Sequence, residues 1–367
     1  MRNILKKAFI LVLVLSLVFS LYGCSEKSDI PKTEDIPTIS NNADSLDEKP
    51  EEGSFVLDAT GRKLYIPEKE TVTIASAYAV SVPFIVALDL SDNVLAINYK
   101  SKFWADNKEG LAKAGSVGRG IVDLEALASF GPDLLIHRTN DAKVEEAAKN
   151  LDIPVMGISA ENIDEIYATL DMIAAFCHKE ERAEEVKNWM KMKFETISEI
   201  VETIPEEEKL TALVLGGELG VIAGGDMLQS LMVEYAGGIN VAKDIEGGNM
   251  GKEIASAWAN IGLEKLFDIN PDVMFLTSST VLDYTVEELL TGPEFSSLEA
   301  VKTGRVFLIP AKMDSWDLPG VSCVIGTYFM LHSMYPELVS EEQLQSEIDD
   351  YYTFMFGKTF TKESLGY

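Results

Sequence analysis

The chain has 367 residues, a hydrophobic fraction of 47% and a formal net charge of −29 at pH 7. This length is sufficient for two domains, and the apolar fraction is that of a globular protein. The acidic balance argues against nucleic acid as a partner, because phosphate binding requires clustered lysine and arginine.

The N-terminus has the pattern of an export signal. Basic residues precede an uncharged apolar run over residues 8–21, which is typical of a secretory signal and short for a membrane-spanning helix. The run ends in LYGC, which resembles a bacterial lipobox; a plain secretory signal is the alternative. We therefore predict a signal peptide at 1–23 and lipidation of Cys24, which would anchor the exported protein to the outer face of the cytoplasmic membrane.

The segment that follows, residues 24–52, is polar, acidic and contains proline, with no apolar period. This composition predicts a disordered acidic tether.

From Phe55 onward the sequence alternates between short apolar runs and helical patterns. The expected strands are 71–75, 94–98, 134–137 and 155–158, and the expected helices are 83–88, 124–130, 142–150 and 163–176. Strands that alternate with helices predict a mainly parallel sheet with helices on its faces. We assign residues 53–178 to an N-terminal α/β lobe.

Residues 179–203 predict one long helix. The stretch contains neither glycine nor proline, and its apolar residues recur at helical spacing, as at Val186, Met190 and Phe194. About 25 residues at roughly 1.5 Å each give a rod of about 37 Å, long enough to connect two domains. We place an interlobe helix at 179–204.

The β/α alternation then resumes in a second lobe, residues 205–367. The expected strands are 210–215, 221–223, 273–276 and 306–309, with helices at 227–235 and 341–356. The Gly-rich segment around 216–225 predicts tight turns or a hairpin. The predicted fold class is α/β, with two Rossmann-like lobes joined by a single long helix.

One phrase, L-E-x-L-x-x-x-x-P-D, occurs once in each lobe, at 124–133 and at 263–272. Each copy predicts a two-turn helix that ends before proline and leads into a buried strand, with its leucines facing the sheet. Glu125 and Glu264 occupy the first helical turn. Compensation of the helix dipole explains one such glutamate, but less readily the same one in both lobes.

Together these stretches resemble the class III (cluster A) substrate-binding proteins of ABC importers. The resemblance runs from about residue 55 to 338 and is carried by DATGRKLYIP, GSVGRGIVDLEALASFGPDLLI, LDIPV, MVEYAGGINVA, IGLEKLFDINPDVMFL and AVKTGRVFLIP, in this order. It implies two lobes, a rigid connecting helix and a ligand cleft between the lobes. It also implies that Glu125 and Glu264 dock onto arginines of a dimeric permease.

The resemblance and the strand ends together give a set of expected ligand-binding residues. They are Tyr99, Arg119, Arg138, Trp258 and, in the KMDSWD loop, Asp314 and Trp316, with Tyr78, Trp104 and His137 added by proximity. Two arginines in so acidic a chain favour an anionic ligand with planar oxygen acceptors. Tryptophans suit a flat ligand or the lobe core, and Asp314 and Asp317 would orient the arginines or cap a turn.

Other chemistries find little support in the sequence. His137, His178 and His332 are far apart, so neither a bare divalent-metal site nor a bound cofactor is expected. Motifs of nucleotide binding or hydrolysis are absent from the sequence, and an enzyme is not expected. Cys177 and Cys323 are expected to be buried thiols, with a disulfide as the alternative.

The sequence thus predicts a monomeric substrate-binding lipoprotein that captures an anionic metal chelate, foremost a ferric siderophore. Its partners would be an ABC permease dimer with its ATPase, and the membrane through the lipid anchor. Haem, a corrinoid, and molybdate or tungstate remain alternative ligands. A lipid-anchored sensor or adhesin of the same fold is the alternative of another class.

Overall fold

The computed structural model describes residues 53–118, 121–139, 141–244, 258–277 and 280–367. The predicted signal peptide, Cys24, the tether and Arg119 lie outside these residues. Within them, no helix combines the length and the apolar character needed to cross a membrane.

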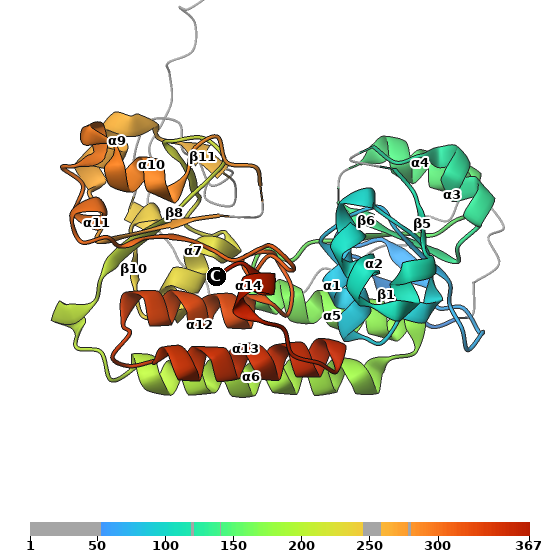
Figure 1. Ribbon diagram of the computed structural model, residues 1–367. Coiled ribbons are helices and arrows are strands. Elements are labelled where there is room, and N and C mark those ends of the chain that lie inside the picture. Colours follow the sequence, from blue (N-terminus) through green and yellow to red (C-terminus); the bar gives the residue numbers. More distant parts are fainter. Residues whose placement is uncertain (1–52, 119–120, 140, 245–257, 278–279) are drawn as a thin grey trace, which may run out of the picture. The chain divides into compact units, whose positions relative to one another are not determined.

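The first lobe is built on a parallel sheet in the strand order β5-β4-β3-β6-β7 (Figure 1). Its strands are β3 (Ile74–Ser76), β4 (Val94–Ile97), β5 (Gly115–Ser116), β6 (Leu134–Arg138) and β7 (Val155–Ile158), preceded by an antiparallel hairpin of β1 (Phe55–Leu57) and β2 (Lys63–Tyr65). Its helices are α1 (Ser81–Ala87), α2 (Lys102–Asn107), α3 (Leu124–Phe130), α4 (Ala142–Asn150) and α5 (Ile163–Cys177). The predicted parallel sheet is confirmed.

The second lobe has a mixed sheet in the order β11-β9-β8-β12-β13, with β10 beside β8. Its strands are β8 (Thr211–Leu215), β9 (Val221–Ala223), β10 (Ile239–Asn240), β11 (Trp258–Asn260), β12 (Val273–Leu276) and β13 (Val306–Leu308). The helices are α7 (Leu228–Tyr235), α9 (Gly262–Ile269), α10 (Val286–Thr291), α11 (Glu299–Lys302), α12 (Cys323–Met334), α13 (Glu341–Phe356) and α14 (Lys362–Leu365). β8 and β9 pair antiparallel, which confirms the predicted hairpin.

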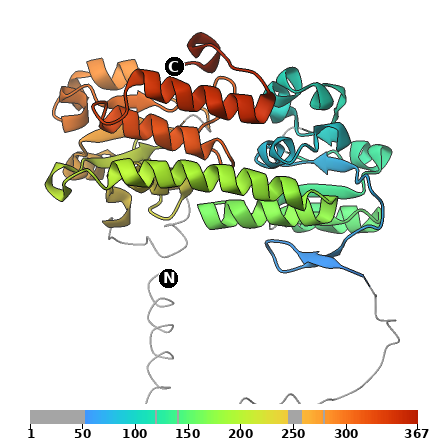
Figure 2. The ribbon, with the colours of Figure 1, turned by 90° about the horizontal axis from the view of Figure 1, so that it is seen from below.

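The long helix predicted over 179–203 is confirmed as α6 (Glu180–Val201). It contacts α1 and α5 of the first lobe and α7 and α12 of the second. Figure 2 shows this helix running along both lobes. α13 lies against it, because the ring of Trp189 stacks on that of Phe354 at 5.0 Å and Lys193 forms ion pairs with two carboxylates of α13.

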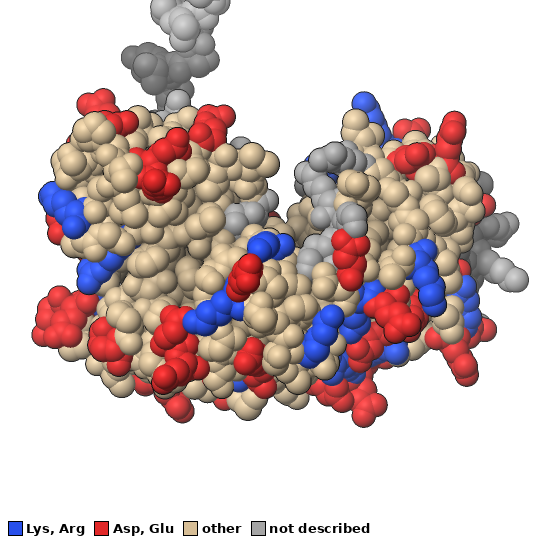
Figure 3. All heavy atoms as spheres, viewed as in Figure 1, with Lys and Arg blue, Asp and Glu red and all other residues tan. Residues whose placement is uncertain are grey.

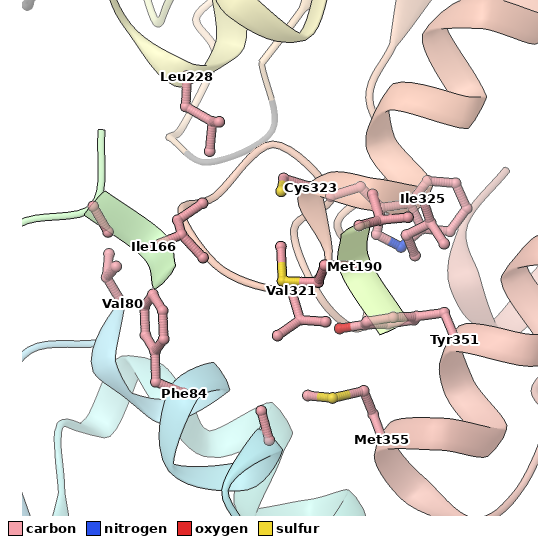
Figure 4. Packing of buried hydrophobic residues seen from close by; sticks show 14 of the residues in the cluster. Val80, Phe84, Ile166, Met190, Leu228, Val321, Cys323, Ile325, Tyr351 and Met355 are labelled. Carbon is pink, nitrogen blue, oxygen red and sulfur yellow. The ribbon is translucent and has the colours of Figure 1, made fainter. Parts of the chain in front are cut away.

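One apolar core continues from the first lobe into the second. Phe84 of α1, Ile166 of α5, Met190 of α6 and Cys323 of α12 belong to the same buried cluster (Figure 4). A wide hinge motion would expose this surface to water, so the packing favours a small closure of the lobes. Cys177 and Cys323 are both buried free thiols, as expected.

Candidate ligand-binding site

The carboxyl ends of the first lobe's strands share one edge of the sheet. Tyr78 follows β3, Tyr99 follows β4, Arg138 ends β6, and Glu161 follows β7. Because these strands are parallel neighbours, the residues after them gather where open α/β sheets bind their ligands.

This edge faces the second lobe. The loop after β13 reaches across to α1, where a Cβ added at Gly320 would lie 3.3 Å from the Cβ of Pro83. Pro83 lies five residues after Tyr78, at the start of α1. Figure 3 shows a hollow between the two lobes on the face in view. The strand ends of the first lobe and the loop of the second are therefore the candidate lining of an interlobe cleft.

Tyr78, Arg138 and Glu161 are electrostatic neighbours within this edge. Burial raises the pKa of the Tyr78 phenol, the charge of Glu161 raises it further, and the charge of Arg138 lowers it. Burial also raises the pKa of Glu161, with a smaller contribution from Glu165. The site therefore combines a cation, a phenol and a half-buried carboxyl that accepts a proton more readily than usual.

Arg138 and His137 both contact one carboxylate. The Arg138 guanidinium, whose side chain is 60% exposed, lies 3.3 Å from Asp141, whereas the buried His137 ring lies 3.1 Å from the same oxygen. The hydrogen bond from His137 is the main cause of a lowered pKa at Asp141, which also caps α4 through the Val144 N–H. Arg138 thus keeps most of its side chain exposed beside this ion pair, whereas the buried His137 supports Asp141.

The aromatic candidates divide into two groups. Tyr99 is exposed, and Trp258 is half-buried at the start of β11, where its ring occupies the space left by the missing side chain of Gly216. Trp104, in contrast, is buried and stacks on Phe356 of α13 with the ring centroids 5.3 Å apart. Trp104 fixes α2 against α13 and does not present its ring to the cleft.

Two predicted ligand contacts in the KMDSWD loop must be corrected. Trp316 is fully buried and donates its indole N–H to the Tyr352 hydroxyl at 3.1 Å. Asp314 is also buried and accepts a hydrogen bond from the Tyr351 hydroxyl at 2.6 Å. Burial raises the pKa of Asp314 to about 7. Both side chains are therefore part of the buried core and are hydrogen-bonded to α13.

Asp317 of the same loop has a structural role within the loop, in line with the expected alternative that it caps a turn. Its carboxylate accepts hydrogen bonds from Ser315 at 2.9 Å and from Thr277 at the end of β12. The carboxylate therefore ties the loop to the sheet of the second lobe.

Sequence reasoning missed Glu161. The signal was its position three residues after the end of β7, at the same sheet edge as Arg138, but an isolated glutamate after a strand is usually a solvated residue. Its half-burial beside Tyr78 required the structure.

Both copies of the repeated phrase place an exposed glutamate in the first turn of a helix, Glu125 in α3 and Glu264 in α9. The prediction that the leucines face the sheet is only half right. Leu127 and Leu266 are fully buried, whereas Leu124 and Leu263, which begin the phrases, are exposed. The second leucine of each phrase, and not the first, packs on the sheet.

The Pro-Asp end of each phrase has a structural task that the sequence did not reveal. Asp133 accepts hydrogen bonds from the backbone N–H and the hydroxyl of Thr73, just before β3. Asp272 does the same with Thr211 at the start of β8. In each lobe this aspartate–threonine contact joins the end of the helix unit to the central strand.

A separate groove of about 520 Å³ lies along α6, between α5 and α7. Its lining includes Tyr167, Phe194 and Tyr235, and none of the sequence-predicted site residues. It therefore does not coincide with the cleft at the strand ends.

Comparison with known proteins places this architecture in a family. Residues 74–313 match the family model described as periplasmic binding protein. The chain is 20% identical over 341 residues to the molybdate-binding protein MolA of Haemophilus influenzae, covering 84% of this chain and 93% of the relative. The structure of MolA bound to molybdate superposes with a TM-score of 0.70, at 17% identity, over 84% of this chain and 99% of that one.

Two relatives come from Bacillus subtilis. The chain is 25% identical over 313 residues to an uncharacterized ABC transporter substrate-binding lipoprotein, YvrC, over 82% of this chain and 93% of the relative. It is 26% identical over 229 residues to the Fe(3+)-citrate-binding protein YfmC, over 58% and 66% respectively. With the family model matching well over half of its length, the chain belongs to the periplasmic binding protein family and is a substrate-binding protein of an ABC transporter.

Proposed function

We propose that this protein captures an anionic metal chelate in its interlobe cleft, with a ferric siderophore as the leading candidate, and delivers it to an ABC permease dimer. The observation that carries the proposal is the exposed guanidinium of Arg138 at the carboxyl edge of the sheet, beside Tyr78. An arginine fork pairs with planar carboxylate or catecholate oxygens through two parallel hydrogen bonds. Arg119, which we also assign to the site, would add a second cation.

Glu161 favours a chelate over a bare oxyanion. A carboxyl beside Tyr78 and Arg138 repels a small, fully deprotonated anion, but it accepts hydrogen bonds from a ligand that carries hydroxyl or amide groups. Chelates of iron with organic ligands carry both anionic oxygens and such donors. Tyr99 and Trp258 would cover the organic part of the ligand, since Tyr99 is exposed and Trp258 is half-buried.

Molybdate or tungstate is the second candidate, and the similarity to a molybdate-binding protein favours it. Haem and corrinoids suit the half-buried ring of Trp258, but with Trp104 and Trp316 buried the cleft has fewer flat surfaces than the sequence suggested.

The delivery part of the proposal rests on the two lobes. Glu125 and Glu264 would each pair with arginines of one permease subunit, because a twofold transporter presents the same surface twice. We further propose export through residues 1–23, lipidation of Cys24, a tether over 24–52, and a monomer that acts at the outer face of the membrane. A sensor or adhesin would share the anchor and the fold but not the need for a docking contact on each lobe.

Calorimetric titration of the chain from Ser25 onward tests the ligand. The panel comprises a ferric catecholate, a ferric hydroxamate, ferric citrate, haem, cobalamin and molybdate. We expect micromolar or tighter binding of one iron chelate and about a tenfold to hundredfold weakening in Arg138→Ala, since it removes a charge-assisted hydrogen bond. The matched control is Arg305→Ala, because Arg305 precedes β13 at the opposite, amino end of a strand.

Each other result has a definite meaning. Binding of molybdate alone would select the second candidate, and binding of haem or cobalamin alone would select a flat ligand. An equal loss of affinity in both arginine variants would contradict the assignment of Arg138. No binding across the panel would favour the sensor or adhesin.

A further inference from the structure

Two leucines are exposed at the same position in both lobes. Leu124 is 40% and Leu263 is 41% exposed, and neither belongs to an apolar cluster of the described core. The remaining shared positions of the phrase have intramolecular tasks: the second leucine fills the core, and the aspartate holds the central strand. The first leucine and the glutamate beside it are the two exposed residues that the phrases share.

Each lobe also exposes a β-branched aliphatic residue. Ile121 is 85% exposed and precedes Leu124 by three residues, whereas Val281 is 89% exposed. They are the two most exposed large apolar residues in the described part of the chain, and each lobe has one.

Val281 and the start of α9 both touch the β8–β9 turn, at different residues of that turn. A Cβ added at Gly217 would lie 3.0 Å from the carbonyl oxygen of Val281, and one added at Gly220 would lie 2.9 Å from the carbonyl carbon of Gly262. The turn thus touches both Val281 and the residue before Leu263. Each lobe accordingly presents a glutamate, a leucine and a β-branched residue on neighbouring segments.

We propose that Leu124 with Ile121, and Leu263 with Val281, form two equivalent apolar contacts that seat in matching hollows of the permease dimer around the docking glutamates. This inference rests on the proposed function. One apolar side chain on a surface is ordinary, but the same leucine beside the same acid in two lobes matches a partner with twofold symmetry. Apolar residues around an ion pair exclude water and strengthen it, as in other interfaces where a rim shields a charged centre.

The partner follows from the family and the chemistry. Homologues of this chain function with the permease and ATPase components of ABC transporters. A dimeric permease, as proposed above, would offer equal surfaces to the two lobes. A lipid surface would not require an acid beside each leucine, because anionic headgroups repel carboxylates. A second copy of this chain would likewise place glutamate against glutamate.

Site-specific photocrosslinking in intact cells tests the contact without knowledge of the ligand. Benzoylphenylalanine replaces Leu124 or Leu263 in the full-length protein, and mass spectrometry identifies the crosslinked chain. The matched controls are Leu151 of the first lobe and Leu290 of the second, each 38% exposed. A probe at Glu125 reports docking itself. We expect crosslinks to a multispanning permease from 124, 263 and 125, and none from the controls.

Binding of the protein to membrane vesicles that contain the permease measures how much the apolar contacts add to the affinity for the permease. The double variant Leu124→Ser with Leu263→Ser should bind about tenfold or more weakly, whereas Leu151→Ser with Leu290→Ser should bind like the wild type. Melting curves should show that both double variants are folded, because all four substituted residues are exposed.

The outcomes separate this inference from the proposed function. Crosslinks from 125 but not from 124 or 263 would overturn the apolar contact and leave docking intact. Crosslinks from the controls as strong as from 124 and 263 would overturn it as well. An absence of permease crosslinks at every position, including 125, would refute docking and the apolar contact together.

Discussion

The two copies of the repeated phrase fold alike but are fixed by different neighbours. In both, a helix of two turns ends in a left-handed residue, Gly131 with φ of 54° and Asn270 with φ of 45°, followed by proline and the strand-binding aspartate. Some residues of the phrase therefore have the same structural role in both lobes, whereas others make contacts that occur in one lobe only.

The first copy relies more on charge. Asp133 forms an ion pair with Lys69 in addition to its bonds with Thr73, and Asp123 caps α3 by accepting the N–H of Ala126. In the second copy, the Asn270 side chain accepts the N–H of Glu299, which attaches α11 to the end of α9. The residues that the two phrases share therefore fix the helix and its strand in both lobes. The residues that differ fix contacts with neighbouring segments that are particular to one lobe.

The largest expected effect is a loss of uptake when the docking glutamates of both phrases are removed together. The double variant Glu125→Ala with Glu264→Ala should reduce uptake about a hundredfold or more while ligand affinity stays unchanged, because two charge-assisted contacts to the permease are lost. Uptake of the labelled chelate that the titration identifies is measured in cells. Glu146→Ala with Glu287→Ala, two exposed helix glutamates elsewhere on the lobes, is the control. Unimpaired uptake in the first double variant would remove the docking assignment.

The buried leucine should dominate stability in both lobes. Leu127→Ala and Leu266→Ala should each lower the free energy of unfolding by about 2–5 kcal/mol, since both side chains are fully buried. Leu124→Ala and Leu263→Ala should each change it by less than about 0.5 kcal/mol, as exposed substitutions do. Urea denaturation measures all four. A similar loss at the first and fourth positions would mean that both leucines pack on the sheet.

Removal of the carboxylate that binds the central strand should have the next largest effect on stability. Asp133→Asn and Asp272→Asn should each cost about 1–3 kcal/mol of unfolding free energy, because the carboxylate accepts two hydrogen bonds from one threonine. The loss should be larger at Asp133, which also holds Lys69. Equal losses would mean that the lysine contributes nothing.

The pH dependence of the free energy of unfolding should reveal what the Asp133 carboxylate contributes to stability. Burial opposes ionisation of Asp133, but hydrogen bonds from Lys69 and Thr73 outweigh it and hold its pKa below the usual value of 3.8. The folded state then binds fewer protons than the unfolded state near that value. The contribution is therefore complete above pH 3.8 and lost as the pH falls through the lowered pKa. Asp133→Asn should flatten the acid limb of a stability curve measured below about pH 4.

These contrasts show what the sequence could and could not predict. Hydrophobic periodicity was sufficient for the alternation of strands and helices and for α6, because these depend on local pattern. The repeated phrase also located both short helices correctly. It could not show that Leu124 is exposed while Leu127 is buried, since both fit one helical stripe.

The cleft was less predictable than the fold. Arg138 follows from its place at a strand end, but the burial of Trp316 and Asp314 depends on α13, which lies across them from a distant part of the sequence. The same holds for Trp104 and Phe356. Contacts between segments far apart in the chain decide which loop residues face a ligand, and single-sequence patterns carry no record of them.

The smallest expected effect concerns the left-handed residue that ends each helix. Space is open at Gly131, where an added Cβ meets nothing within 4 Å, and asparagine tolerates this conformation. Gly131→Asn should therefore change the free energy of unfolding by only about 0.5 kcal/mol. Asn270→Gly keeps the backbone relaxed but removes the hydrogen bond to the Glu299 N–H, which should cost about 1 kcal/mol. Because both variants exchange the same two residues in equivalent places, a difference in thermal melting between them isolates the attachment of α11. Equal melting shifts would mean that the Asn270 side chain serves only the helix end, as the glycine does in the first lobe.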